Sequence, residues 1–332
     1  MEASSLALFW AGVIALSILV YVLLDGFDLG VGILFGTTRD EMKREQMMSA
    51  ISPFWDGNET WLVVIGASLF AAFPPVYAVF LGAFYLPVLL MLIGLIFRWI
   101  AFEFRNHSRR LSWLWDHGFF YGSVLVAFVQ GAAVGAMMRG IPTENGQYAG
   151  GAFTWLHPFP ILTGIGLVLG YALLGAGWLV LKSDGAVRDW ARERVRPLVI
   201  GVVVVLGLAF VITMTVDAGA IAQNNLDQRS WGIAFPIVGL LALVGVHFFA
   251  RKDADSLPYT LTAVFFIAAF LTLGVMMWPY MIPYGLTVAD AAAPEASLRF
   301  FSYAGFVALP IITIYTIGVY WVFRGKIGQP QS

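Results

Sequence analysis

Apolar runs of about 20 residues recur along the whole chain and constrain its fold more than any other feature. The runs do not alternate between apolar and polar residues, so they predict helices that cross a membrane and not the strands of a membrane barrel. Of the 332 residues, 60% are hydrophobic and only 12% are charged, whereas a soluble domain carries about 25% charged residues. We therefore expect an all-α integral membrane protein.

The sequence predicts about nine transmembrane helices. The predicted spans are Ser5–Phe35, Phe54–Phe73, Val76–Phe102, Leu114–Met138, Phe159–Leu181, Pro197–Ala222, Trp231–Ala250, Tyr259–Ile282 and Ser302–Phe323. With this count, sixteen of the 19 basic residues lie on one side, and only Arg139, Arg229 and Arg299 on the other. Basic residues concentrate in cytoplasmic loops, which predicts an extracytoplasmic N-terminus and a cytoplasmic C-terminus.

The glycine-rich polar loop Arg139–Trp155 is the expected break between two groups of four spans. We expect residues 1–145 to form a first four-helix bundle and residues 146–290 a second one. Residues 291–332 are then a peripheral ninth helix with a cytoplasmic tail. Small residues four apart, such as Gly26 and Gly30, would let helices approach closely.

Ionisable residues interrupt the first four predicted spans near the expected cytoplasmic side. Asp25 and Asp28 are three residues apart, as are Asp56 and Glu59, so each pair shares a helix face. The same depth holds Arg98, Glu103, Arg105, Asp116 and His117. Because a charge in the middle of a bilayer costs about 2.5–3.5 kcal/mol on insertion scales, we expect these groups to gather in one patch.

Three interpretations of this patch stay open. In the first, Arg98 and Arg105 pair with the carboxylates and hold the helices together. In the second, one carboxylate is the entrance of a proton path; Asp56 is the first candidate, followed by Glu59 and Asp25. In the third, the charges are merely interfacial and carry no function.

Ligands for metals and haem are scarce. The absence of cysteine excludes disulfides, iron–sulfur clusters and thiolate-bound metals. His107, His117, His157 and His247 all fall near span ends or in loops, whereas a haem–copper oxidase core needs several histidines deep in the membrane. We expect no metal or haem bound by this chain, and His117 as a partner in the charge patch. A net charge of −1 offers no basic field for nucleic acid.

Several motifs resemble subunit II of the cytochrome bd-type quinol oxidases. They are LDGFDLGVG (24–32), PFWDGNETWL (53–62), LFAAFPPVYA (69–78), IFRWIAFEFR (96–105), LWDHGFFYGS (114–123), WPYMIP (278–283) and YTIGVYW (315–321). The resemblance covers the whole chain and is strongest over residues 20–125. Glu59, Thr60 and the short length look more like the cyanide-insensitive branch.

The resemblance implies a subunit of a bacterial inner-membrane complex that oxidises quinol and reduces oxygen to water. Its haems, of b type and of d or b type, would belong to the partner, a haem-bearing subunit I. This chain would ligate no haem, stabilise that partner and contribute a cytoplasmic proton path. Some members of the family also have an oxygen path or a bound structural quinone here. Membrane lipids are expected contacts, and a small accessory transmembrane subunit stays open.

The resemblance also implies roles for individual residues. Asp56 matches the family's proton-entrance aspartate, and Trp61 matches the tryptophan near it. Asp28, Arg98 and Asp116 match positions linked to oxidase assembly. Glu103 stands where the family has an aspartate, so the charge is retained.

Two alternatives to a proton-conducting subunit remain. Nine spans with intramembrane carboxylates also fit a stand-alone ion-coupled secondary transporter. A purely structural subunit without a proton role is the other alternative. Co-purification with a haem protein would exclude the transporter, and substitution of Asp56 would separate the two subunit roles.

Overall fold

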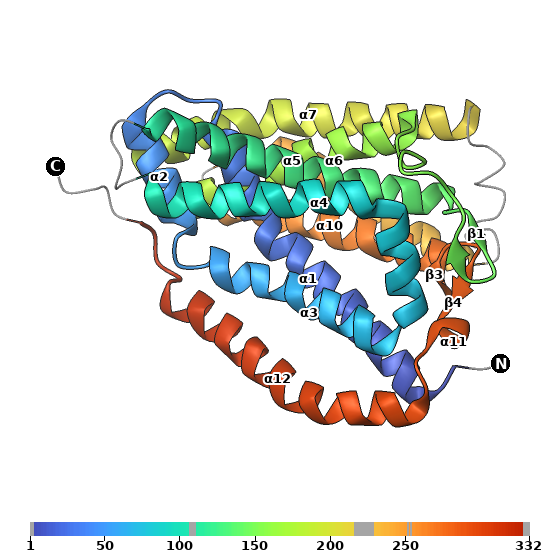
Figure 1. Cartoon of the computed structure of the whole chain (residues 1–332). Coiled ribbons are helices and arrows are strands. Elements are labelled where there is room, and N and C mark those ends of the chain that lie inside the picture. Colours follow the sequence, from blue (N-terminus) through green and yellow to red (C-terminus); the bar gives the residue numbers. More distant parts are fainter. Residues whose placement is uncertain (1–2, 106–110, 216–228, 251, 253, 328–332) are drawn as a thin grey trace.

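The structure is a computed structural model that describes residues 3–105, 111–215, 229–250, 252 and 254–327. Nine long helices dominate these residues (Figure 1). They are α1 (Ser5–Phe35), α3 (Trp55–Ala72), α4 (Pro74–Phe104), α5 (Ser112–Arg139), α6 (Pro158–Lys182), α7 (Gly185–Thr215), α9 (Ala234–Phe249), α10 (Ser256–Met277) and α12 (Glu295–Val322). The short helices are α2 (Glu41–Ile51), η1 (Ser230–Ile233) and α11 (Val288–Ala291).

Eight helices in the described part of the chain are long and apolar enough to cross a membrane. The 18-residue helix α3, predicted as the second span, is not among the eight, because its first turns carry Asp56, Asn58 and Glu59. The predicted all-α membrane fold is confirmed. Its count of nine is met only when the polar-ended α3 is included.

Helix α7 differs from its prediction at its start. The structure begins it at Gly185, twelve residues before the predicted start at Pro197. Charged residues between Arg188 and Arg196 indicated a loop, but they form the first turns of the helix and make ion pairs there. The predicted end, residues 216–222, lies outside the described residues.

Helix α1 is central to the packing. It contacts α3, α5 and α6, while α4 packs on α5 and α6 packs on α7 and α10 (Figure 1). Contacts of α6 with both α1 and α5 join the two predicted groups of four helices. The division of the chain at residues 145 and 290 stays a prediction.

Glycine allows the closest of these contacts. A Cβ atom on Gly30 of α1 would lie 1.8 Å from the carbonyl oxygen of Tyr171 on α6, and one on Gly175 would lie 2.4 Å from the backbone of Gly30. The two backbones therefore touch where side chains would hold them apart.

Helix α12 runs along one edge of the molecule, parallel to α1 (Figure 1). Near its start, Ser302 Oγ accepts a hydrogen bond of 3.0 Å from Trp10 Nε1 of α1. Its only buried residues are Leu298, Ser302 and Gly305, all in its first half. The helix is thus peripheral, as the sequence predicts for the ninth span.

The helices end at two opposite faces. One face, which we call the α2 end, carries α2 with the C-terminal ends of α1, α4, α6 and α12 (Figure 1). The other, the hairpin end, carries the antiparallel pairs β1 (Thr143–Glu144) with β2 (Gln147–Tyr148) and β3 (Tyr280–Ile282) with β4 (Leu286–Thr287). Helix α1 starts at the hairpin end and α12 finishes at the α2 end.

Helix α4 bends sharply near the hairpin end (Figure 1). Phe84 departs from helical geometry, with φ −113° and ψ 23°, and Pro87 follows it. Proline has no N–H, so the carbonyl of Ala83 loses its helical partner and the helix kinks. The straight segment after the kink carries Arg98 toward the α2 end.

Candidate functional site

Three helices bring buried charges together near the α2 end. Arg98 of α4 donates from Nη1 to Asp25 Oδ1 of α1 and to Glu59 Oε1 of α3, each at 3.1 Å. Asp25 is fully buried, and the side chains of Arg98 and Glu59 are 2% and 19% exposed. One guanidinium thus links two carboxylates from different helices inside the membrane region.

Asp28 lies one turn further along α1 and has a different partner. Asn58 of α3 donates from Nδ2 to Asp28 Oδ2 at 2.7 Å and to the carbonyl of Leu24 at 3.2 Å. The hydroxyl of Tyr320, from α12, donates to Asn58 Oδ1 at 3.0 Å. We call Asp25, Asp28, Asn58, Glu59 and Arg98 the buried cluster.

The buried cluster contains three carboxylates and one guanidinium. Within the described residues, Asp25 Oδ2, Asp28 Oδ1, and Arg98 Nε and Nη2 are buried and have no hydrogen-bond partner. If all three carboxylates were ionised, the cluster would be net negative, which is costly in a low-dielectric setting. A proton on one of these carboxylates would reduce that cost.

Exposure falls stepwise from the surface to this cluster. Asp56 is exposed on the first turn of α3, Glu59 lies one turn further on the same face, and Asp25 is fully buried beyond Arg98. Trp61, also on α3, is 6% exposed. These residues form a graded series from solvent inward.

A second cluster lies closer to the surface of the α2 end. Arg105, which follows α4, donates from Nε to Asp116 Oδ1 of α5 at 2.6 Å and also pairs with Glu41 of α2. Arg44 of α2 binds Asp116 Oδ2 at 2.7 Å and Glu41 at 3.2 Å. We call Glu41, Arg44, Arg105 and Asp116 the interfacial cluster.

Both arginines of the interfacial cluster also face an aromatic ring. Arg44 lies 4.9 Å and Arg105 5.4 Å from the ring centre of Phe35, which ends α1. Partial burial alone would lower the pKa of Arg105, but the hydrogen bonds to Asp116 and Glu41 outweigh it and raise the pKa above its usual range. The cluster ties α2 to the ends of α1, α4 and α5.

The structure corrects the prediction of one patch in three respects. The predicted charges separate into the buried and interfacial clusters. Among the described residues, His117 joins neither: it is exposed, with Nδ1 2.6 Å from the carbonyl of Trp113 and its ring stacked on Tyr121. Glu103 is exposed on the last turn of α4.

Two partners in the buried cluster were not among the predicted site residues. Asn58 sits between Asp56 and Glu59, and a polar amide inside a span was the signal for it. Tyr320 comes from the last turn of α12, and its hydroxyl points inward to Asn58. A third polar contact lies deeper, where Gln130 of α5 bonds the hydroxyls of Tyr21 and Tyr171 at 2.8 and 2.9 Å.

The histidines in the described part of the chain lie near helix ends. No group of three histidine or acidic side chains in the described ranges could hold a metal ion. His117 and His247 lie near the α2 end, and His157 precedes α6 at the hairpin end. Histidine at these helix ends cannot provide axial ligands in mid-membrane. His107 lies outside the described residues.

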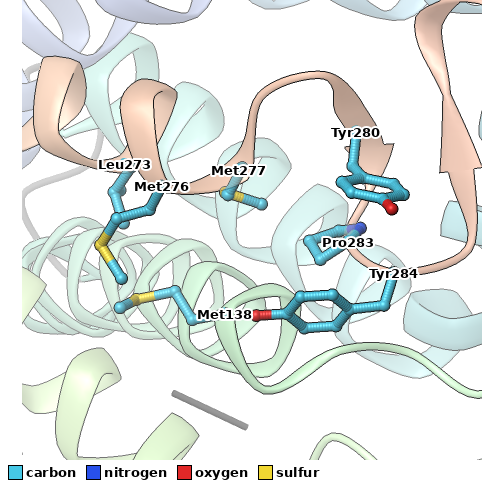
Figure 2. Close-up of a pocket in the computed structure, with 7 residues that line it drawn as sticks. All are labelled: Met138, Leu273, Met276, Met277, Tyr280, Pro283 and Tyr284. Carbon is cyan, nitrogen blue, oxygen red and sulfur yellow. The ribbon is translucent and has the colours of Figure 1, made fainter. Parts of the chain in front are cut away.

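A pocket at the hairpin end is chemically different from the clusters. It lies between α5, the C-terminal end of α10 and the segment after α10, and is lined by Met138, Leu273, Met276, Met277, Tyr280, Pro283 and Tyr284. Figure 2 shows the ring of Tyr284 directed toward Met138, whose side chain extends toward Met276. The lining has no charged side chain, so this pocket is not part of the candidate proton site.

Comparisons with known proteins agree over nearly the whole chain. The family model for cytochrome bd terminal oxidase subunit II matches residues 6–323. Subunit 2 of the cytochrome bd-I ubiquinol oxidase of Escherichia coli (strain K12) is 31% identical, over 96% of this chain and 94% of that protein. Subunit 2 of the cytochrome bd ubiquinol oxidase of Bacillus subtilis (strain 168) is 29% identical, over 97% of each.

A solved structure shares the fold. A chain of the bd oxidase from Geobacillus thermodenitrificans matches with a TM-score of 0.75, over 97% of this chain and 99% of that one. The sequence identity in this match is 11%. This likeness supports the helix arrangement described above.

Proposed function

Because the chain belongs to the cytochrome bd terminal oxidase subunit II family, we propose that it provides a cytoplasmic proton path for a quinol-oxidising, oxygen-reducing complex. Its partner would be a haem-bearing subunit I, as the family membership implies. The haems supply the oxygen chemistry when bound in that partner. The family membership favours this role over a stand-alone transporter.

The graded exposure of Asp56, Glu59 and Asp25 carries the proposal. Asp56 accepts a proton from solvent, and Glu59 lies one turn further on the same face of α3. Arg98 then holds Glu59 and Asp25 on one nitrogen, Nη1, at 3.1 Å each. A proton on either carboxylate weakens its bond to Arg98 and strengthens the other, so the guanidinium couples their charge states.

The α2 end would face the cytoplasm. Basic side chains gather there, including Lys43, Arg44, Lys182, Arg188 and Arg192, while Arg139, Arg229 and Arg299 lie toward the hairpin end. Cytoplasmic faces of membrane proteins are rich in lysine and arginine. Proton uptake at Asp56 would then come from the cytoplasm, with the N-terminus outside.

A structural role is the second candidate. Arg98 joins α1, α3 and α4 through Asp25 and Glu59, and the interfacial cluster joins α2, α4 and α5. Removing one partner of a buried pair leaves the other charge uncompensated and costs several kcal/mol, about 3–5. These bonds would hold the surface that stabilises the haem-bearing subunit.

The test compares Asp56→Asn and Glu59→Gln in the complex purified with its haem partner. The haem-to-protein ratio is measured first, and then the rate of quinol-driven oxygen consumption across pH 5.5–9. Glu45→Gln is the matched control, because Glu45 is an exposed carboxylate on α2 at the same end. The proposal predicts normal haem content and at least a tenfold slower rate for Glu59→Gln, with the control unchanged.

Two results would decide against a proton path. Wild-type rates in fully assembled Asp56→Asn and Glu59→Gln complexes would place the path elsewhere. Loss of haem or of the complex in Glu59→Gln, with normal turnover per remaining haem, would support the structural role instead.

A further inference from the structure

Two lysines join the segment that follows α12 to the neighbouring helix ends. Lys182, the last residue of α6, donates from Nζ to the carbonyl of Phe323 and, at 3.2 Å, to that of Gly325. Lys326 pairs with Asp184 at 2.7 Å and with Asp255 at 2.8 Å. The Ile327 N–H donates to the Lys182 carbonyl at 2.8 Å. We call these contacts the tail latch.

Lys182 is well suited to hold a helix end. Its side chain is buried, with Nζ 5.1 Å from the ring centre of Phe54 and 5.3 Å from that of Trp178. The carbonyls at a helix C-terminus lack internal partners and carry the negative end of the helix dipole. The ammonium therefore binds the carbonyls of the C-cap residue Phe323 and of Gly325, just beyond α12, from a position beside two aromatic rings.

The second half of α12 has few other attachments within the described chain. Its buried residues all lie in the first half, and Ile311, Ile314, Ile317 and Trp321 are each more than 60% exposed. Near its end, Tyr320 turns inward and packs on Phe54, with ring centres 4.7 Å apart. The tail latch begins only three residues after Tyr320.

Tyr320 and the carbonyl of Leu24 together fix how Asn58 presents its amide, because that carbonyl accepts from Asn58 Nδ2 at 3.2 Å. The hydroxyl of Tyr320 donates to Asn58 Oδ1, which leaves Nδ2 to donate to Asp28 Oδ2 at 2.7 Å. An amide turned by 180° would offer oxygen to the Asp28 carboxylate and repel it. The position of the α12 end is thereby connected to the hydrogen bonding of a fully buried carboxylate.

We propose that the tail latch, with Lys182 at its centre, positions Tyr320 and so fixes the Asn58 amide that binds Asp28 in the buried cluster. The inference rests on the proposed function of that cluster. Lys182, Lys326 and Tyr320 are positioning residues, since they act on Asp28 through Asn58. Quinol-driven turnover should therefore depend on a lysine that lies outside the proton path.

The experiment is a double-substitution cycle in the purified complex with its haem partner. The variants are Lys182→Met, Tyr320→Phe and the pair combined, each assayed for haem content and for oxygen consumption across pH 5.5–9. Lys326→Gln gives a milder break of the latch, in case Lys182→Met does not assemble. Lys252→Met is the control, because that lysine also packs on an aromatic ring, Phe249, but on α9.

The proposal predicts that Lys182→Met and Tyr320→Phe each slow turnover by about fivefold, the effect of one lost neutral hydrogen bond. Both substitutions should displace the pH profile equally. The combined variant should be no slower than Tyr320→Phe alone, because Lys182 acts on turnover through Tyr320. Lys182→Arg should restore the profile, and Lys252→Met should match the wild type.

Three outcomes would overturn it. Additive effects of the two substitutions would mean that the latch does not act through Tyr320. Normal pH profiles in Tyr320→Phe and Lys326→Gln, alongside a slow Glu59→Gln complex, would contradict the proposed role of the tail latch but leave the proposed proton path standing. Normal pH profiles in all of these variants, Glu59→Gln included, would contradict the proposed proton path and, with it, the proposed role of the tail latch.

Discussion

Tyr320 and Asn58 are 262 residues apart in the sequence, and the hydroxyl of Tyr320 donates to Oδ1 of Asn58 at 3.0 Å. The bond joins the peripheral helix α12 to the polar first turns of α3. Because Asn58 in turn donates to Asp28, the outermost helix contributes to a carboxylate on the innermost one. The candidate site is thus a property of four helices and not of one motif.

Arg98→Ala should be the most damaging single substitution in the buried cluster. It leaves Asp25 and Glu59 without their shared cation, and breaking such a buried pair costs about 3–5 kcal/mol. We expect low yield and low haem content of the complex, measured by visible absorption per milligram of purified protein. Arg299→Ala is the control, because Arg299 and Glu295 form an exposed pair on α12, worth about 0.5 kcal/mol or less.

An unchanged yield of Arg98→Ala would contradict the structural importance of this arginine. Arg98→Lys refines the test, since it keeps the charge but loses the planar group that bridges two carboxylates. We expect its yield to lie between those of the wild type and Arg98→Ala.

Gly30→Ala should separate α1 from α6. The new Cβ would lie 1.8 Å from the Tyr171 carbonyl oxygen, which is backbone and cannot rotate away. Overpacking of this kind costs about 1–3 kcal/mol or more, so we expect a lower midpoint of thermal unfolding. Gly12→Ala on the same helix has nothing within 4 Å of its Cβ and should leave the midpoint unchanged. Equal midpoints for both variants would mean that the helices are not in backbone contact.

Asp116→Asn should weaken the attachment of α2 without changing the buried cluster. Asp116 accepts from Arg105 at 2.6 Å and from Arg44 at 2.7 Å, and hydrogen bonds to charged groups are worth about 1.5–3 kcal/mol each. We expect faster proteolysis in the segment around α2, monitored by mass spectrometry, with normal turnover of the intact complex. Slower turnover with normal proteolysis would instead place Asp116 in the proton path.

The ion pairs of the tail latch should be insensitive to pH near neutrality. Partial burial would raise the pKa of Asp255, but hydrogen bonds from Arg188 and Lys326 outweigh it and lower the pKa. The hydrogen bonds with Asp184 and Asp255 raise the pKa of Lys326. The stability that Asp255 contributes is therefore complete above its unfolded pKa of about 3.9 and is lost as pH falls through the lowered folded pKa. The stability that Lys326 contributes is complete below its unfolded pKa of about 10.4 and is lost as pH rises through the raised folded pKa.

The check is the difference in unfolding midpoint between the wild type and Lys326→Gln, measured from pH 3 to pH 9. The difference should be constant between about pH 5 and pH 9 and shrink below about pH 4. A difference that vanished between pH 6 and pH 8 would show that another titrating group controls the latch.

Hydrophobic runs predicted most of the fold, because a helix that crosses a bilayer is predominantly apolar over about 20 residues. The exception was α7, where the charges from Arg188 to Arg196 indicated a loop. In the structure they stay helical, because Asp255, from the loop before α10, pairs with Arg188 and Arg192. The charged residues that indicated a loop are therefore compatible with a helix, and the reason is visible only in their ion pairs with Asp255.

The buried cluster was predicted in its residue types but not in its pairing. Spacing placed Asp25, Glu59 and Arg98 at one depth, but helix rotation decides that Arg98 faces Asp25 and Glu59 while Arg105 faces Asp116. The contact of Tyr320 with Asn58 depends on where a ninth helix returns to the bundle, which local sequence does not encode. The prediction for His117 was wrong because of helix rotation, since its side of α5 faces outward.

The most direct measurement is proton uptake during a single turnover of the complex in vesicles, followed with a pH-sensitive dye on the side of the α2 end. Reduced wild-type complex should take up protons from that side as oxygen is consumed. With normal haem content, the Asp56→Asn Glu59→Gln double variant should take them up at least tenfold more slowly. Uptake at the wild-type rate, or uptake from the hairpin end, would contradict a cytoplasmic proton path through this chain.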